Sequence, residues 1–187
     1  AFQSRLALLC TLVVAVVGVV TQPGAAVEAY TPVLADPVSE PWRWHRYPEL
    51  SGRGVQCLAE APDGAMWFGV NDGVLRYDGL RWHKYSAEHG LDGGPILDVS
   101  CGMEGSVYVH SAGHVFRLGG KEWLRIYPVE DGAQASIHGM AVDRHGSVWA
   151  GTADGLVCIR RNGEIRMVLP ESVRQVCIGK SGDLWCL

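Results

Sequence analysis

The feature that most constrains the fold of this chain is a sequence repeat of about 40 residues. Its four copies are VQCLAEAPDGAMWFG (55–69), ILDVSCGMEGSVYVH (96–110), IHGMAVDRHGSVWAG (137–151) and VRQVCIGKSGDLWCL (173–187). A turn glycine recurs as Gly64, Gly105, Gly146 and Gly182, and an aromatic residue follows three positions later as Trp67, Tyr108, Trp149 and Trp185. Self-similarity at a fixed period is the mark of a repeat architecture, so one structural unit is used several times.

Each copy subdivides into short β-prone runs separated by turn signals. In the first copy these signals are Pro62-Asp63-Gly64, Asn71-Asp72-Gly73 and Asp78-Gly79. Asn-Gly and Asp-Gly turns between apolar or alternating runs favour β-hairpins, and no helical period follows residue 30. Four antiparallel strands in every ~40 residues predict an all-β fold made of β-propeller blades. A solenoid is the main alternative, but its coils are usually shorter.

The repeat also sets the expected domain organisation of residues 41–187. We expect blades at about 54–85, 94–127 and 136–168, and half a blade at 172–187. The stretch PWRWHRY (41–47) resembles GLRWHKY (79–85), the last strand of the first copy, and is predicted to be a lone outer strand. Propellers usually have ~4–8 blades. About three and a half blades therefore predict an N-terminal fragment of a longer protein.

The first 29 residues differ in kind from the repeats. Arg5 precedes the apolar run 6–20, and small residues follow up to Ala29. This order predicts a secretory signal peptide, with cleavage after Ala29 or, second, after Ala26. A transmembrane anchor is the alternative, although the apolar run is short of the ~20 residues that span a bilayer. Because the chain starts at Ala rather than Met, the signal peptide is expected to lack its true start, and residues 30–40 are expected to form a linker.

Charge and cysteine usage narrow the function classes. The net charge is -4 and the 16 Lys and Arg residues are scattered, so no nucleic-acid partner is expected. The cysteines after the leader are Cys57, Cys101, Cys158, Cys177 and Cys186. Their number is odd and no CxxC pair occurs, so no disulfide framework, zinc site or redox motif is indicated. We interpret most of them as small buried apolar residues in strands.

The stretches DGAMWFGVNDGVLRYDG (63–79) and HGSVWAGTADGLVCI (145–159) carry a specific resemblance. Their pattern Asp/His-Gly-x-x-Trp-x-Gly-Thr-x-x-Gly-Leu resembles the two-component-regulator propeller repeat of hybrid sensor histidine kinases and related diguanylate cyclase sensors. The matching positions are Gly64, Trp67, Gly69 and Gly73, and Gly146, Trp149, Gly151, Thr152, Gly155 and Leu156. The chain departs from the pattern at Val70 and, in the second copy, at Tyr108 and His110.

The resemblance implies a periplasmic sensor region of an inner-membrane protein. In that family a signal peptide leads into tandem seven-bladed propellers, followed by a β-sandwich, a membrane span and signalling domains. The implied partners are an extracytoplasmic small molecule or glycan, the rest of the propeller, the downstream signalling domains and, in the full-length protein, a second copy. No cofactor is implied. Two other functions stay open: an exported propeller enzyme such as a lyase, and a binding scaffold of the cell envelope.

The stretch 63–79 contains several residues that could form a site, but its repetition along the chain argues against each of them. Asp63 is replaced by Glu104, His145 and Ser181 in the other copies, which favours a turn residue over a catalytic carboxylate. The spacing of Gly64 and Gly69 lacks the Lys-Ser/Thr and the helix of a phosphate-binding loop. A calcium loop at Asn71-Asp72-Gly73 lacks further ligands. No catalytic residue is predicted.

A metal site at His110-x-x-x-His114 lacks a nearby third ligand, so no metal is predicted. The recurrent aromatic residues are expected to pack between blades rather than to stack on sugars, because each copy has one at the same place. Ligands are expected at the loops that join neighbouring blades and second strands to third strands. The polar candidates in and beside these loops are His89, Asp92, His110, Asp131 and Asp154.

Overall fold

The structure, a computed structural model, describes residues 44–128 and 135–187. The predicted signal peptide, the linker and Asp131 lie outside the described residues. The chain divides into two units, Ala1–Arg46 and Tyr47–Leu187, and every described strand belongs to the second. Among the described residues, no helix has the length and apolar character needed to cross a membrane.

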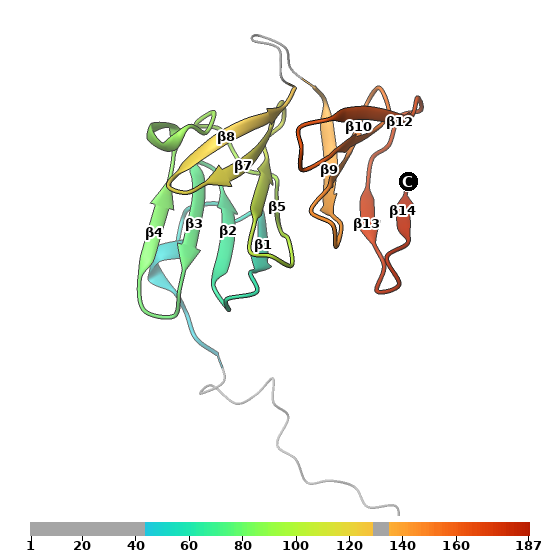
Figure 1. Ribbon diagram of the computed structural model, residues 1–187. Coiled ribbons are helices and arrows are strands. Elements are labelled where there is room, and N and C mark those ends of the chain that lie inside the picture. Colours follow the sequence, from blue (N-terminus) through green and yellow to red (C-terminus); the bar gives the residue numbers. More distant parts are fainter. Residues whose placement is uncertain (1–43, 129–134) are drawn as a thin grey trace, which may run out of the picture. The chain divides into compact units, whose positions relative to one another are not determined.

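The second unit consists of successive antiparallel sheets (Figure 1). Blade 1 contains β1 (Cys57–Glu60), β2 (Met66–Val70), β3 (Gly73–Tyr77) and β4 (Trp82–Tyr85); blade 2 contains β5 (Asp98–Cys101), β6 (Val107–His110), β7 (Val115–Gly119) and β8 (Glu122–Tyr127). Blade 3 contains β9 (Ile137–Val142), β10 (Val148–Thr152), β11 (Leu156–Ile159) and β12 (Ile165–Leu169), and β13 (Val176–Ile178) pairs with β14 (Leu184–Cys186). Two 3₁₀ turns, η3 (Pro48–Leu50) and η4 (Ala87–His89), complete the described elements.

The strand register reproduces the sequence repeat. In blade 1, Trp67 of β2 faces Ala59 of β1 and Arg76 of β3, and in blade 2 Tyr108 of β6 faces Arg117 of β7 in the same way. Each blade is a meander in which consecutive strands pair, and the first strands β1, β5, β9 and β13 contact one another in that order. The predicted fold class, an all-β propeller of four-stranded antiparallel blades, is confirmed.

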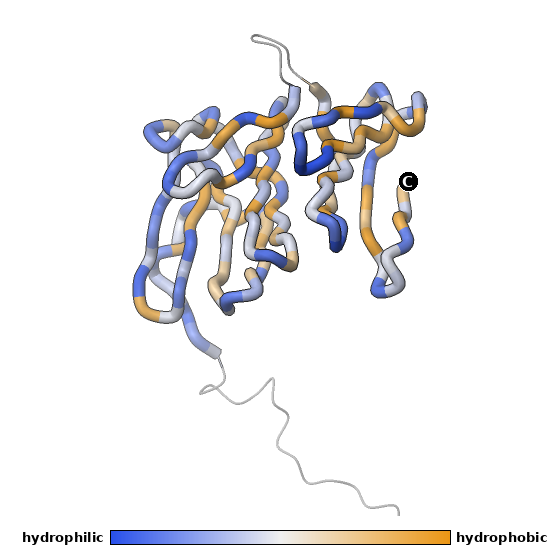
Figure 2. The backbone as a smooth tube through the Cα atoms, in the orientation of Figure 1, coloured by the Kyte–Doolittle hydropathy of each residue, from blue (hydrophilic) through white to orange (hydrophobic). Residues whose placement is uncertain are grey.

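The apolar core lies between consecutive blades. Trp67 and Val74 of blade 1 pack against Val109 and Phe116 of blade 2, and all four side chains are nearly inaccessible to solvent. A second cluster joins Tyr108 of blade 2 to blade 3, and a third joins blade 3 to β13 and β14. In Figure 2 the turns that join β9 to β10 and β13 to β14 are hydrophilic, whereas apolar residues follow the strands. Burial of these faces is the main contribution to the stability of the fold.

The open sides of the first and last sheets expose residues that are buried elsewhere. Leu58 of β1 is 62% exposed, although Val99 and Met140, at the same place in β5 and β9, are buried. Trp185 of β14 is 65% exposed, whereas Trp67 is 3% exposed. A repeat position is therefore buried only where a neighbouring blade covers it.

The predicted lone strand at 41–47 is not observed in its described part. Residues 44–47 form no strand, and η3 follows at Pro48. An extended segment becomes a strand only when its backbone groups pair with a neighbouring strand, and no described strand pairs with this segment. The similar sequence in β4 does form a strand because β3 supplies its partner, as in the pair Tyr77–Trp82. Tyr47 instead packs its ring against these two, with centroids 5.3 and 5.5 Å away.

Candidate functional site

The loop between β4 and β5 places Asp92 beside blade 2. The 3₁₀ turn η4 begins this loop. The Ser86 side chain accepts a hydrogen bond from the His89 amide, and the His89 side chain accepts one from the Ser86 amide. Gly90 follows with φ +93°, and a side chain there would overlap the carbonyl oxygen of Trp123 in β8. Only glycine allows this close approach. The loop therefore runs along blade 2 and carries Asp92 to the turn between β6 and β7.

The turn between β6 and β7 presents Ser111 and His114 to Asp92. The Ser111 amide donates to the His114 carbonyl oxygen at 3.0 Å, and the His114 amide donates to Ser111 Oγ at 3.2 Å. Both side chains then converge on one carboxylate oxygen. Ser111 Oγ lies 2.7 Å from Asp92 Oδ2, and His114 Nδ1 lies 2.7 Å from the same atom.

The roles of the three groups follow from their donor and acceptor chemistry. An ionised carboxylate only accepts hydrogen bonds, so the Ser111 hydroxyl donates to Asp92 and the His114 imidazole carries its proton on Nδ1. A serine nucleophile requires its hydroxyl to be hydrogen-bonded to a base that takes the proton. Ser111 is bonded to the carboxylate and not to the imidazole. The geometry is suited to holding a ligand rather than to acyl transfer.

These residues line an open cleft of about 490 Å³. The lining residues are Asp92, Gly94, Pro95, Ser111, Ala112, Gly113, His114, Ala135 and Ser136. The loop that enters blade 3 closes one side, with the Ala135 amide donating to the Gly113 carbonyl oxygen at 3.1 Å. The volume lies in the range of small-molecule sites. Among the described lining residues, Asp92 and His114 are ionisable and no lysine or arginine is present.

His110, predicted as a ligand-binding residue, lies at the end of β6 and is only 2% exposed. It occupies the position that Gly69 has in blade 1 and Gly151 in blade 3. At both glycines a Cβ atom would approach the next blade, coming within 2.9 Å of the Ile96 carbonyl oxygen and 2.8 Å of the Val173 carbonyl oxygen. Blade 2 therefore places an imidazole where the other blades have room for no side chain.

His110 also replaces a backbone hydrogen bond that elsewhere joins neighbouring blades. The Ile96 amide donates to the Val70 carbonyl oxygen, and the Val173 amide donates to the Thr152 carbonyl oxygen, both at 3.0 Å. At the equivalent Ser111 carbonyl oxygen, His110 Nδ1 is the donor, at 2.9 Å. The amide of the next blade bonds instead to Ala112, one residue further on, at 3.4 Å.

Asp98 of β5 faces His110 in the strand register. Its carboxylate accepts from the Val99 amide at 2.8 Å and from the Met140 amide of blade 3. Burial raises the pKa of Asp98 above its ordinary value, although the charge of His110 acts in the opposite direction. Burial also lowers the pKa of His110, against the bond to Ser111 and the charge of Asp98. His110 and Asp98 thus lie behind the cleft, at the contact between blades 2 and 3.

The other predicted ligand residues are not brought to the cleft. His89 accepts the Ser86 amide at 3.3 Å and packs edge-on against Tyr85, so its side chain holds the loop. Asp154 belongs to the turn between β10 and β11, where its amide donates to Thr152 Oγ1 at 3.2 Å. Asp131 lies outside the described residues. Of the five predictions, Asp92 lines the cleft and His110 lies directly behind it.

The structure places no metal centre at His110 and His114. Their Nδ1 atoms bond to different groups, the Ser111 carbonyl oxygen and the Asp92 carboxylate. Across residues 44–128 and 135–187, no group of three or more His, Cys, Asp and Glu side chains is arranged to hold a metal ion.

Sequence reasoning did not single out Ser111 and Asp98. A signal for Asp98 exists in the aligned repeats, because Asp98 replaces Cys57 and Gly139 where the strands pair. A charged residue at a position where the other copies have small residues marks a local departure from the repeat. The meeting of Ser111 with Asp92 has no such signal, because it depends on the path of a loop.

No protein-family model and no curated protein matches this chain. Solved structures do match. The extracellular domain of BT4673, described as a hybrid two-component system of B. thetaiotaomicron, is 20% identical with a TM-score of 0.59, over 71% of this chain and 19% of that one. The extracellular domain of BT3049, of the same description and organism, is 16% identical with a TM-score of 0.60, over 76% of this chain and 22% of that one.

A catalytically inactive virginiamycin B lyase from Staphylococcus aureus with quinupristin is also similar. Its identity is 16% and its TM-score 0.57, over 76% of this chain and 50% of the lyase. The chain thus spans about a fifth of the two extracellular domains and half of the lyase. At these identities the likeness shows the fold that the proteins share and no common activity.

Proposed function

We propose that this chain is part of an extracytoplasmic ligand-sensing β-propeller of a membrane-bound signal receptor of the two-component type. The observation that carries the proposal is the Asp92 cleft, in which two side chains of the β6–β7 turn converge on a carboxylate oxygen from the β4–β5 loop. Loops on a rigid β-scaffold are where binding residues are concentrated. The proposed ligand is a small molecule or glycan.

Three further observations support an exported sensor. Residues 1–29 have the order of a secretory signal peptide. The repeat resembles that of periplasmic sensor regions of hybrid histidine kinases. Two structural neighbours are extracellular domains described as hybrid two-component systems. We therefore place the described blades in the periplasm, as part of an inner-membrane protein that works as a dimer with downstream signalling domains.

Signalling requires that the ligand favour one arrangement of the receptor over another. The cleft lies where the loop into blade 3 rests on the turn of blade 2, through Ala135 and Gly113. A ligand held by Asp92 and His114 that also touches Ala135 or Ser136 would contact both blades. Binding would then stabilise one arrangement of blades 2 and 3 over another, and a sensor requires such a difference.

The enzyme alternative has weaker support. A propeller lyase is among the structural neighbours, but its likeness concerns the fold. The described residues closest to a catalytic constellation are Asp92, Ser111 and His114, in which the serine hydroxyl bonds to the carboxylate. The imidazole Nδ1 bonds to the same carboxylate and not to the hydroxyl, unlike the serine–histidine pair of a serine nucleophile.

Binding of a glycan array by the full-length protein tests the proposal, with Asp92→Ala as the site variant. We expect the variant to lose the array signals and to keep the thermal stability of the wild type. Glu88→Gln is the matched control, since Glu88 is an exposed carboxylate of the same loop outside the cleft. Equal array signals for Asp92→Ala and wild type would overturn the assignment of the site. A reading frame that ends soon after the ring closes, with no membrane span, would overturn the receptor.

A further inference from the structure

We propose that a second cleft, between blades 2 and 3 at the opposite end of the strands from Asp92, binds a small carboxylate with an apolar body. It encloses about 360 Å³. The lining residues are Tyr108, Arg117, Ile126, Gly146, Val148, Ile159, Arg160, Arg161, Asn162 and Gly163. The turns β9–β10 and β11–β12 contribute to it, whereas the Asp92 cleft lies at the turn β6–β7. The two sites therefore share a blade junction but no residue.

Arg76 of blade 1 occupies the position that Arg117 has in blade 2, and its charge is neutralised by two carboxylates. Arg76 faces Trp67 across β2 and β3, and its guanidinium carbon lies 5.7 Å from the centre of that ring. Its nitrogens lie 3.1 Å from Asp63 Oδ2 and 3.8 Å from Asp78 Oδ2. Two carboxylates and an aromatic face thus hold this cation.

Blade 2 keeps the arginine but neither of these two ion pairs. Arg117 faces Tyr108 in the register that Arg76 has with Trp67, and Gly119 stands in place of Asp78. Glu104 stands in place of Asp63, but its carboxylate is ion-paired with Arg161 of blade 3. Among the described residues, no side-chain hydrogen bond or ion pair joins Arg117 to another group. A partly buried guanidinium without a counter-charge is a site for an oxyanion.

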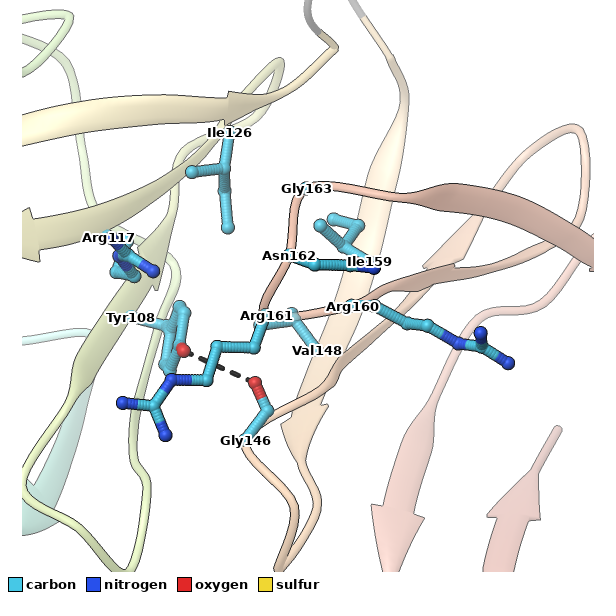
Figure 3. Close-up of a pocket in the computed structure, with 10 residues that line it drawn as sticks. All are labelled: Tyr108, Arg117, Ile126, Gly146, Val148, Ile159, Arg160, Arg161, Asn162 and Gly163. Carbon is cyan, nitrogen blue, oxygen red and sulfur yellow. Dashed lines mark hydrogen bonds between the residues drawn. The ribbon is translucent and has the colours of Figure 1, made fainter.

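Figure 3 shows how the side chains are arranged around this cleft. Arg117 and Ile126 come from blade 2, and Ile159 and the turn 160–163 come from blade 3. The Tyr108 hydroxyl donates to the Gly146 carbonyl oxygen at 3.3 Å and joins the two blades across the cleft. The guanidinium of Arg160 is directed away from Tyr108 and Arg117.

The walls of the cleft determine the ligand class. Val148 and Ile159 are 1% and 3% exposed and form an apolar wall together with Ile126. None of the described residues that line the cleft is acidic. The planar fork of Arg117 matches a carboxylate through two parallel hydrogen bonds, and the apolar wall favours a hydrocarbon body over a bare inorganic ion.

Phenylacetate titrated calorimetrically into the full-length protein tests this site. We expect Arg117→Gln to weaken its binding by about tenfold or more, because a hydrogen-bonded charge is lost. Arg166→Gln is the matched control and should change the affinity by less than about twofold, because Arg166 is an exposed arginine of β12 that does not line the cleft. Arg117→Lys keeps the positive charge but not the planar guanidinium, so it should bind phenylacetate with intermediate affinity. It replaces Arg117→Gln in the comparison if the glutamine variant does not fold.

The ligand chemistry is tested with two further probes. The neutral 2-phenylethanol should bind at least about tenfold more weakly than phenylacetate if the carboxylate is recognised. Inorganic phosphate should also bind more weakly if the wall of Val148 and Ile159 contributes. Equal affinity of wild type and Arg117→Gln, tighter binding of phosphate than of phenylacetate, or no binding of phenylacetate at millimolar concentration would each overturn the proposal.

Discussion

The imidazole of His110 donates a 2.9 Å hydrogen bond to the carbonyl oxygen of Ser111, where the other blades use a backbone amide of the next blade. The side chain is 2% exposed and faces Asp98 across the strands. The contact between blades 2 and 3 therefore depends on a titratable group. Neither of the flanking blade contacts, through Val70 and Thr152, has this dependence.

This arrangement predicts that stability falls on acidification. Burial lowers the folded-state pKa of His110 below 6.5, its ordinary value. Between the lowered pKa and 6.5, the unfolded chain binds a proton that the folded chain does not, so the free energy of unfolding rises with pH in this window. His110→Gln should therefore flatten the dependence of the melting temperature on pH below 6.5. His83→Gln, at an exposed histidine, is the control.

Asp98 contributes with the opposite sign at lower pH. Its pKa is raised above 3.8 by burial, so the folded chain retains a proton that the unfolded chain has lost. The free energy of unfolding therefore falls as pH rises from 3.8 through the raised value. Asp98→Asn should remove this fall. An unchanged melting profile in both His110→Gln and Asp98→Asn would show that the pair does not couple folding to pH.

A second prediction concerns the turn between β10 and β11. Gly155 has φ +151°, and a Cβ atom there would overlap the carbonyl oxygen of Leu169 in β12. Gly155→Ala should lower the free energy of unfolding by more than the ~1–3 kcal/mol of backbone strain alone, because β12 must also shift. Gly64→Ala should cost less, since Gly64 has a positive φ but no atom within 4 Å of the added Cβ. Urea unfolding midpoints of the two variants give the comparison.

The inter-blade core predicts a large effect at Phe116. This side chain is 2% exposed and belongs to the cluster that joins blades 1 and 2. Phe116→Ala should destabilise the fold by about 3–5 kcal/mol through lost burial and a residual cavity. Leu80→Ala, at a leucine that is 90% exposed, should stay within about 0.5 kcal/mol of the wild type. Chemical denaturation measures both, and a similar loss for the two would contradict the assigned core.

Thiol reactivity should divide the cysteines by burial. Burial raises the pKa of Cys57 and of Cys101 to about 11, and it also raises the pKa of Cys158. The thiolate is the reactive form, so these three should resist alkylation until the chain unfolds. Cys177 and Cys186 are exposed free thiols and should react first. Peptide mapping after a short pulse of iodoacetamide separates the two groups, and fast labelling of Cys57 would contradict its burial.

Much of the fold could be predicted because its signals are local. The turn glycines, the aromatic residue three positions later and the alternation of apolar residues each act within a few neighbours, and hairpins form from neighbouring strands. Residues 44–47 of the segment predicted as a lone strand form no strand in the structure. A strand needs a pairing partner, and similarity to β4 does not supply one.

The candidate site could be predicted only in part. Asp92 was singled out because its loop joins two blades, but His89 and Asp154 were equally plausible from sequence and lie elsewhere. For His89 and Asp92 the difference is the loop path, which depends on Gly90 fitting against Trp123, whereas Asp154 lies in a turn of blade 3. The sequence pattern carries no record of that contact.

The sequence by itself determined the repeated four-stranded unit, because hydrophobic alternation and turn chemistry operate over a few residues. Only the tertiary structure decided where charges find partners. Asp92 is shared by Ser111 and His114 because loops of two blades meet, and no described carboxylate pairs with Arg117 because Glu104 pairs with Arg161 of the next blade. Such pairings depend on distances between groups far apart in the chain, which no local pattern encodes.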